Sequence, residues 1–352
     1  MKAYIITFHW ATNYGAVLQA YALQSYLLSH GYDIKIINYV PSGYEKTLLR
    51  SLRARSVKRI YKQLLEYRKE QKIEKFRKKY LRLTEKYSNQ ESLKEHNWEN
   101  ALYICGSDQI WNPFFTLHGE NKVTLPYFLD FTSQGRKISY AASFGVTNIS
   151  PEMEHVIVPL LDEFSRITVR EKSAVSMLHK LKIKAELICD PVFLLQRIDY
   201  ERLFQGKEKK EKTGIFRYIL HEEQDVAFQM AESVRRELHE DFRGNVDTMS
   251  VEEWLETLST SNFVVTNSFH AIAFSLLFHV PFVAVLIKNS GMNDRIITLL
   301  ETVQLSKRAV FDMTQGQIKS LVKENIEWSI VDCNIQNMRN QAVKLLQGIE
   351  VK

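Results

Sequence analysis

Short apolar runs alternate along this chain with longer segments of helical periodicity. Residues 4–8 are apolar, residues 16–29 repeat apolar side chains at helical spacing, and residues 33–39 are apolar again. Short apolar runs are typical of strands buried in a parallel sheet, and parallel neighbours need a crossover such as a helix. The start of the chain therefore predicts an α/β fold that opens with a Rossmann-like unit.

The alternation occurs in two blocks. Further strands are predicted at residues 101–105, 137–142, 167–170, 185–189, 215–220, 263–266 and 282–287, and helices at residues 171–181, 223–239, 251–259, 271–278, 293–300 and 334–347. The charged residues 205–212 separate the blocks. We predict an N-terminal Rossmann-like domain over residues 1–205, a C-terminal one over residues 213–330 with a cleft between them, and a C-terminal helix within residues 331–352.

The composition predicts a cytoplasmic protein. No apolar run approaches the roughly 20 residues that cross a bilayer, and the longest, residues 271–287, is interrupted by His279 and Pro281. The first residues are read as a strand and not as a signal peptide. The three cysteines are widely spaced and form no metal or disulfide pattern, so no metal site is expected.

The positive charge is concentrated in one segment. The net charge is +6, but residues 46–80 hold 14 Lys/Arg and 3 Glu, a local balance of +11. Apolar residues at helical spacing predict one or two long basic amphipathic helices there. The segment is either a solvated helix face or a surface that makes peripheral contact with anionic lipid on the inner face of the membrane. Nucleic acid is not expected, because no recognition motif is present.

Ligands of open parallel sheets bind beyond the carboxyl ends of the strands, so polar loops after predicted strands are the candidate sites. Asn13, Tyr14 and Gly15 follow the first strand. The amides at the start of the next helix can bind an anion, although an ordinary tight turn explains the same residues. The glycine-rich dinucleotide fingerprint is absent, which argues against a nicotinamide or flavin cofactor.

The loop at residues 106–112 is rich in polar side chains, with Ser107, Asp108 and Asn112 beside Trp111. Asp108 can orient or deprotonate a sugar hydroxyl, and Trp111 can stack on a sugar face. The alternative is a helix cap with Trp111 in the core. Ser143, in the next such loop, belongs either to a small nest of backbone amides or to a simple turn.

Three further basic residues are candidates for anion binding. Arg170 follows a strand and can hold a carboxylate or phosphate bidentately, or it can be a surface arginine paired with a nearby glutamate. Lys288 and Arg295 lie in the loop after residues 282–287, although Arg295 can equally pack along its own helix.

The most informative loop contains Asn267, Ser268 and His270, between a predicted strand and a helix. Small polar groups and an imidazole at a helix N-terminus suit an anionic ligand, and His270 can act as a general acid or a phosphate contact. A lone histidine is usually structural. Together with the loop of Lys288 and Arg295, this loop indicates a phosphate-bearing ligand.

Taken together, these segments resemble the polysaccharide pyruvyl transferase family over residues 3–305. The resemblance rests on residues 13–19 (NYGAVLQ), 106–113 (GSDQIWNP), 139–145 (SYAASFG), 169–171 (VRE), 190–191 (DP) and 266–270 (TNSFH). It implies two Rossmann-like domains in a GT-B-like arrangement with a central cleft. It also implies phosphoenolpyruvate as donor, without a cofactor, and the hydroxyl pair of a sugar as acceptor, often on a lipid-linked oligosaccharide. The product would be a pyruvate ketal on a surface or capsular polysaccharide.

By position, Arg170 matches a family arginine near the donor, His270 matches a family histidine, and Lys288 lies where a basic residue follows the next strand. Ser268 stands where other branches carry an arginine, so Lys288, Arg295 or Arg170 is expected to replace that charge.

The resemblance predicts a reaction shared between two domains, with the acceptor on the N-terminal one and the donor on the C-terminal one. His270 would protonate the methylene carbon of the donor, and Asp108 would accept a proton from the sugar. Two rival hypotheses remain open. One is a glycosyltransferase of the same fold that uses a nucleotide sugar, with Glu252 or Glu253 on the ribose, and the other is a non-catalytic sugar-binding protein.

Overall fold

The structure, a computed structural model, describes residues 1–41, 57–118, 122–204, 211–220 and 225–348. It contains two compact units, one formed by Met1–Leu194 with Asn340–Lys352 and the other by Leu195–Arg339. The first unit thus ends at Leu194, before the charged segment where we placed the boundary.

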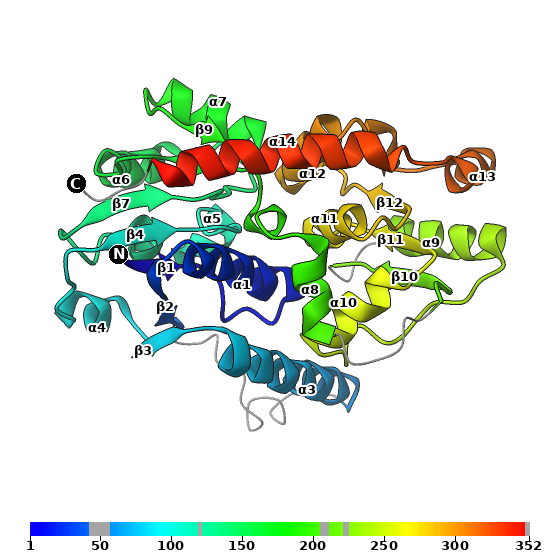
Figure 1. The fold of residues 1–352 in the computed structure, drawn as a ribbon, viewed down its shortest axis with the longest axis horizontal. Coiled ribbons are helices and arrows are strands. Elements are labelled where there is room, and N and C mark those ends of the chain that lie inside the picture. Colours follow the sequence, from blue (N-terminus) through cyan, green and yellow to red (C-terminus); the bar gives the residue numbers. More distant parts are fainter. Residues whose placement is uncertain (42–56, 119–121, 205–210, 221–224, 349–352) are drawn as a thin grey trace. The chain divides into compact units, whose positions relative to one another are not determined.

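The last helix, α14 (Trp328–Gln347), contributes to both units and is not a separate segment (Figure 1). Its first half buries Val331 and Ile335 in the second unit. Its end buries Leu346 in the first unit, where the carbonyl of Leu345 accepts a hydrogen bond from Arg166 at 3.0 Å.

The first unit is built on a five-stranded parallel sheet in the order β3-β2-β1-β4-β7. The strands are β1 (Lys2–Ile6), β2 (Asp33–Tyr39), β3 (Leu83–Tyr87), β4 (Leu102–Cys105) and β7 (Arg136–Ser139). In register, Ile5 of β1 lies between Ile36 and Ile104. The central strand is buried by both neighbours and by α1 (Tyr14–Ser29), as the apolar runs predicted.

Shorter elements complete this unit. They are α4 (Gln90–Glu95), α5 (Pro113–Thr116), β5 (Leu117–His118), β6 (Lys122–Val123), η1 (Leu125–Phe128), α6 (Pro151–Leu161), β8 (Thr168–Val169), α7 (Lys172–Lys180), β9 (Glu186–Leu187) and η2 (Pro191–Phe193). Single bridges from Ile138 and Ala142 extend the sheet toward β8. The strand order reverses between β1 and β4, so the loops after these strands flank the usual ligand position of such a sheet.

The long basic helix is present as α3 (Val57–Tyr80), and residues 46–56 of the predicted segment lie outside the described residues. Its inner face buries Ile73, Phe76 and Arg77. The ring of Phe76 lies edge-on to Tyr21 of α1 at 5.8 Å between centroids. α3 is therefore a structural part of the first unit and not a fully solvated helix.

The second unit is built on a four-stranded parallel sheet in the order β10-β11-β12-β13. Its strands are β10 (Ile215–Tyr218), β11 (Phe263–Thr266), β12 (Phe282–Val285) and β13 (Ala309–Val310). Its helices are α8 (Arg197–Phe204), α9 (Asp225–Leu238), α10 (Val251–Ser259), α11 (Phe269–Leu277), η3 (Gly291–Asn293), α12 (Asp294–Thr302), η4 (Ser306–Arg308) and α13 (Gln315–Lys323). Every residue of α11 is buried, so this helix lies within the core of the unit.

Candidate active site

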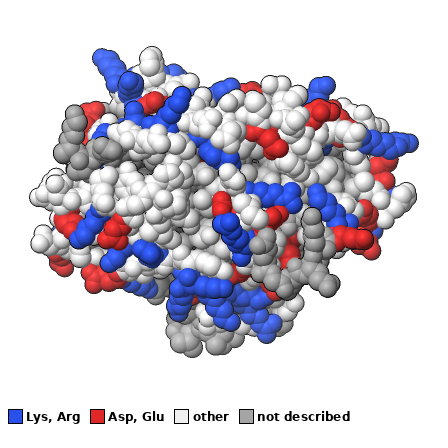
Figure 2. Space-filling model, viewed as in Figure 1, with Lys and Arg blue, Asp and Glu red and all other residues white. Residues whose placement is uncertain are grey.

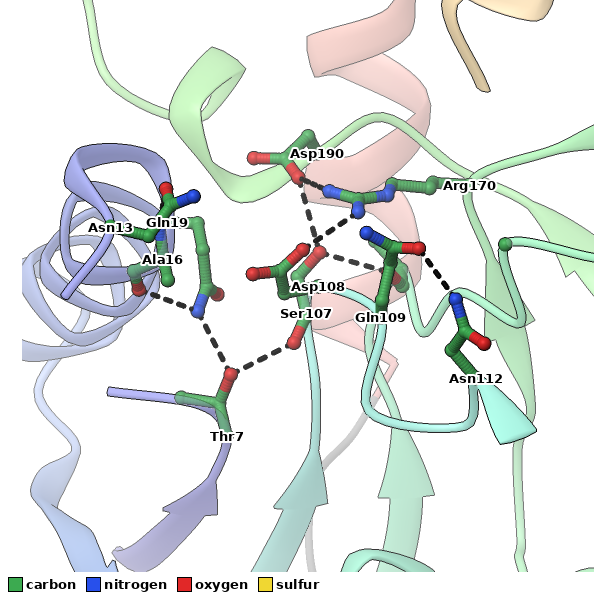
Figure 3. A network of polar contacts seen from close by, with 12 residues as sticks. Thr7, Asn13, Ala16, Gln19, Ser107, Asp108, Gln109, Asn112, Arg170 and Asp190 are labelled. Carbon is green, nitrogen blue, oxygen red and sulfur yellow. Dashed lines mark hydrogen bonds and ion pairs between the residues drawn. The ribbon is translucent and has the colours of Figure 1, made fainter. Parts of the chain in front are cut away.

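Four side chains meet beyond the carboxyl ends of the first unit's strands (Figure 3). Arg170 donates from Nη1 to Asp190 at 2.6 Å and from Nη2 to Asp108 at 2.9 Å. The hydroxyl of Ser107 lies 3.1 Å from the same Asp190 oxygen and 2.8 Å from the carbonyl of Ala141. The side chains of Arg170 and Asp190 are at most 1% exposed, whereas Asp108 is 13% exposed. Asp108 is therefore the carboxylate of this cluster that reaches the surface.

The electrostatics of the cluster bear on the role that we expected for Arg170. Burial alone would lower the pKa of Arg170, but Asp108, Asp190 and Glu171 raise it overall. Asp190 and Asp108 occupy the two terminal nitrogens of this guanidinium, so Arg170 holds both carboxylates in place. Binding of a donor anion by Arg170 stays a prediction.

Glu171 organises the neighbouring loop. Its buried carboxylate accepts hydrogen bonds from the backbone amides of Phe144 at 2.9 Å and Gly145 at 3.3 Å. The nest of amides considered for residues 143–145 is thus formed, but a carboxylate of the chain itself fills it. The hydroxyl of Ser143 is fully buried, so the acceptor contact expected from Ser143 is not available at the surface.

The loops after β1 and β4 are tied together by buried hydrogen bonds. The hydroxyl of Thr7 donates to the carbonyl of Ser107 at 2.8 Å, and the amide of Gln19 donates to the Thr7 hydroxyl at 2.8 Å. Figure 3 shows this chain of contacts running from α1 to the loop of Asp108. Thr7 was not singled out from the sequence, because its partner Ser107 lies 100 residues away, and Gln19 entered only as part of the segment 13–19 that carried the resemblance.

Several residues expected to contact the acceptor are structural. Trp111 is fully buried, stacks on Phe128 at 5.4 Å and donates to the carbonyl of Tyr127, which is the core alternative. Asn112 is 2% exposed, donates to Gln109 and accepts from the amide of Phe114.

The residues before the first helix also differ from the expectation. Tyr14 and Gly15 form the first turn of α1 and are buried. Asn13 is the N-cap of this helix, and its side chain accepts from the amide of Ala16 at 3.2 Å. The predicted loop is therefore shorter by two residues, and of the three only Asn13 keeps partial exposure.

In the second unit, Asn267 and Ser268 prepare the start of α11. The amide group of Asn267 donates to the carbonyl of Leu220 at 2.8 Å and accepts from its N–H at 2.7 Å. Both the oxygen and the nitrogen of the Asn267 side chain are hydrogen-bonded to the backbone. Asn267 therefore continues the hydrogen bonding at the edge of the sheet and is not placed as the donor contact that we expected. Ser268 is the N-cap of α11, and its hydroxyl accepts from Ala271.

His270 lies in the first turn of α11 and is 6% exposed. Arg295, at the start of α12, places its guanidinium 6.0 Å from the ring centre of Phe269, so it comes close to the His270 loop. Lys288 follows β12 and is exposed. Ser268, His270 and Arg295 thus lie at the carboxyl edge of the second sheet. The side chain of Lys288 is exposed to solvent.

A second asparagine repeats the arrangement of Asn267. Asn293 donates to the carbonyl of Ile287 at 2.6 Å and accepts from its amide at 3.0 Å, and it directly precedes α12. The two asparagines fix the two helix starts that carry His270 and Arg295. Sequence reasoning did not single out Asn293, Asp190 or Glu171 as site residues, although Asp190 and Glu171 lie in segments that carried the resemblance.

Two parallel α/β units with polar loops at the carboxyl edges of their sheets define a protein of the GT-B fold. The UDP-GlcNAc 2-epimerase of Methanocaldococcus jannaschii, solved with UDP-GlcNAc and UDP, is similar in fold, with a TM-score of 0.51, 11% identity and 99% of each chain covered. The MurG structure of Acinetobacter baumannii gives 0.42, 11% and 99% of each chain. ADP-heptose LPS heptosyltransferase II of Escherichia coli gives 0.37 and 12%, with 97% of this chain and 99% of that one covered.

The family follows from the sequence itself. The model of the polysaccharide pyruvyl transferase family matches residues 13–289, more than half of the chain. The chain belongs to this family, which indicates a transferase. No curated protein matches it. Among the described residues, no helix combines the length and the apolar character that a membrane crossing requires.

Proposed function

We propose that this protein transfers the pyruvyl group of phosphoenolpyruvate to a pair of sugar hydroxyls, forming a ketal during synthesis of a surface or capsular polysaccharide. The observation that carries the proposal is Asp108. Its carboxylate is held by Arg170, reaches the surface, and lies where the strand order of the first sheet reverses. Asp108 and Arg170 both lie within the segment that matches the family.

The donor half is assigned to the second unit. Phosphoenolpyruvate carries a phosphate and a carboxylate, and the N-terminus of α11 offers backbone amides at the positive end of a helix dipole. Arg295 and Lys288 supply the positive charge that Ser268 lacks in place of the family arginine. The engagement of Arg170 with Asp108 and Asp190 in the first unit supports this assignment.

The reaction needs one acid and one base. His270 donates a proton to the methylene carbon of the donor, which becomes a methyl group while the adjacent carbon becomes electrophilic. A sugar hydroxyl attacks that carbon and passes its proton to Asp108. Phosphate then leaves with the electrons of its C–O bond and takes the proton held by Asp108. The neighbouring hydroxyl attacks the same carbon to close the ketal, and its proton restores His270. The products are the ketal and inorganic phosphate, so atoms and charge balance.

The test is phosphate release from phosphoenolpyruvate in the presence of a panel of hexosides. We expect release to require a sugar, and to fall at least a hundredfold in His270→Ala and Asp108→Asn. His155→Ala, at an exposed histidine of α6, is the matched control and should release phosphate as the wild type does. Release of a nucleotide from a nucleotide sugar, without reaction of phosphoenolpyruvate, would favour the glycosyltransferase hypothesis. Glu253, one ribose candidate of that hypothesis, already caps α10 through Ser250.

We further propose that the acceptor is lipid-linked and that the outer face of α3 contacts an anionic membrane. Lys and Arg gather over α3 in Figure 2, and Arg68, Lys75 and Lys78 are exposed. Glu70 of this helix pairs with the buried Arg77, and Glu74 pairs with both Arg77 and the exposed Lys78. Sedimentation with phosphatidylglycerol vesicles should be lost when the three exposed cations are changed to Glu. Equal sedimentation of the variant and the wild type would disprove the contact.

A further inference from the structure

Trp111 is buried and cannot stack on a sugar, yet other aromatic side chains reach the surface from the loops that follow β1 and β4. Trp10, in the loop after β1, is partly exposed, and Phe114 of α5 is 82% exposed. Phe8 and Phe115 lie between them. Ring centroids are 5.6 Å apart from Trp10 to Phe8, 5.9 Å from Phe8 to Phe115 and 5.0 Å from Phe115 to Phe114. We call these four residues the aromatic row.

The aromatic row is formed by the segments after β1 and β4, the two strands between which the strand order reverses. Trp10 comes from the loop after β1, and Phe114 and Phe115 come six and seven residues after Asp108 in the segment that follows β4. Thr7 and Ser107 tie these two loops together at 2.8 Å, so both ends of the row belong to the same edge of the first sheet as Asp108. The row is therefore continuous with the proposed acceptor side.

The orientation of Trp10 is fixed from two directions. Its indole nitrogen donates to the hydroxyl of Tyr127 at 2.9 Å, and its carbonyl accepts from Nη2 of Arg77 at 2.9 Å. Arg77 also donates to the carbonyls of His9 at 2.7 Å and Ala11 at 2.9 Å. The carbonyls of His9 and Trp10 lie outside any sheet and need donors, which the buried guanidinium supplies, while the carbonyl of Ala11 also accepts from the amide of Asn13 at 2.8 Å. A preorganised aromatic ring binds with a smaller loss of conformational freedom than a mobile one.

The charge of Arg77 is balanced within its own helix. Its Nη1 lies 2.5 Å from Glu70 and 3.1 Å from Glu74, and Glu70 also accepts a hydrogen bond from Thr12. The loop that carries Trp10 is thus clamped at residues 9–12 by α3. A single exposed phenylalanine is ordinary on a protein surface. Phe8 is buried in the core of the unit, and Trp10 and Phe115 pack against that core, so the partly exposed Trp10 and the exposed Phe114 at the two ends of the row are supported from beneath.

We propose that the aromatic row is the acceptor platform, on which sugar rings stack through Trp10 and Phe114. This rests on the proposed function and deepens it, because it names carbohydrate as the ligand of this surface and assigns residues to it. The C–H face of a pyranose packs on an aromatic ring, and its hydroxyls remain available to polar neighbours such as Asp108 and Asn13. Trp10 and Phe114 are separated by two other rings, so each can contact a different sugar ring. This arrangement suits an oligosaccharide better than a monosaccharide.

The test measures sugar binding without turnover, so that it stands apart from the transfer reaction. Saturation-transfer NMR is recorded with methyl hexosides of the gluco, galacto and manno series and with the corresponding disaccharides. We expect saturation of ring C–H protons by the wild type, stronger for disaccharides. The signal should fall at least fivefold in Trp10→Ala and Phe114→Ala, remain largely in Trp10→Phe, and be unchanged in Phe311→Ala, an exposed phenylalanine of the second unit.

Two outcomes would overturn the platform. One is that no hexoside or disaccharide receives saturation, and the other is that Trp10→Ala and Phe114→Ala bind as the wild type does. If the wild type binds sugar but releases no phosphate from phosphoenolpyruvate, the platform stands and the proposed donor fails. Where transfer is measurable, both variants should raise the acceptor KM and leave the donor KM unchanged.

Discussion

The Nη1 atom of Arg170 lies 2.6 Å from Oδ2 of Asp190, and water reaches neither side chain to a measurable extent. An ion pair in this setting adds little net stability, because both charges lose their hydration. Breaking it is costly, since the remaining charge stays buried without its partner. The pair therefore matters for holding Asp108 in one position.

Arg170→Met should accordingly destabilise the protein by about 3–5 kcal/mol in urea unfolding at pH 7. Arg202→Ala removes an exposed pair with Asp199 and should cost less than about 1 kcal/mol. If the two variants unfold at the same urea concentration, the buried cluster is not the structural centre of this loop.

Gly106 should tolerate no side chain. Its φ is +118°, and a Cβ atom would lie 2.4 Å from the backbone carbonyl oxygen of Tyr140. Gly106→Ala is expected to cost about 2 kcal/mol or more, because backbone must move. Gly316→Ala is the control. It lies in α13 with nothing within 4 Å, and it should stabilise the protein by about 0.5–1 kcal/mol.

His9 should make stability depend on pH. Burial lowers its pKa from 6.5 to about 4, although its contacts with the side chain of Asn38 and the carbonyl of Thr7 favour the protonated ring. Below pH 6.5 the unfolded chain binds a proton at this residue and the folded one does not, so stability falls as the pH drops toward 4. Relative to His9→Gln, the wild type should lose about 3 kcal/mol of unfolding free energy between pH 7 and pH 4. A difference that stays constant with pH would contradict a neutral buried His9.

Arg77→Met should release the loop after β1. Without the guanidinium, the carbonyls of His9 and Trp10 lose their donor, that of Ala11 loses one of two, and Glu70 loses its ion-pair partner. Hydrogen exchange of the amides in residues 9–13 should accelerate by at least tenfold. Lys78→Met changes the next residue, whose side chain is 75% exposed, and should leave that exchange unchanged.

Substitution of Asn267 should lower stability, whereas substitution of Lys288 should weaken binding of the donor without lowering stability. Asn267→Ala leaves the N–H and the carbonyl of Leu220 without their partners and should cost about 1–3 kcal/mol. Lys288→Ala at an exposed position should change stability by less than about 0.5 kcal/mol. It should nevertheless raise the KM for phosphoenolpyruvate several-fold. An unchanged KM would remove Lys288 from the donor site.

Periodicity located the main elements well. The strands at Asp33–Tyr39 and Phe263–Thr266 and the helix at Val251–Ser259 have the predicted ends. Local signals were strong there, because apolar runs end at polar or glycine residues. The predicted strand at residues 137–142 ends at Ser139, since Ala141 adopts a φ of 49° that no strand continues. The helices at Pro151–Leu161 and Gln315–Lys323 were not predicted.

The site was harder to predict than the fold. Sequence position selected the loops of Asp108 and His270, because ligand loops follow strands in parallel sheets, and the structure places both loops directly after strands. Sequence position could not distinguish a polar side chain that contacts a ligand from one that hydrogen-bonds to the backbone. Asn267 and Asn112 are of the second kind. Sequence position also assigned the sugar-stacking role to Trp111, since the burial of an indole depends on neighbours such as Phe128 that are distant in sequence.

The last helix has a consequence for the order in which the protein is made. Residues 340–347 of α14 belong to the first unit, yet the ribosome synthesises them after the whole second unit. The nascent N-terminal unit therefore lacks this part of its packing until the second unit has been made. Release of the chain before residue 340 would leave exposed both Arg166 and the surface against which Leu346 packs. Chaperones bind such exposed apolar surface.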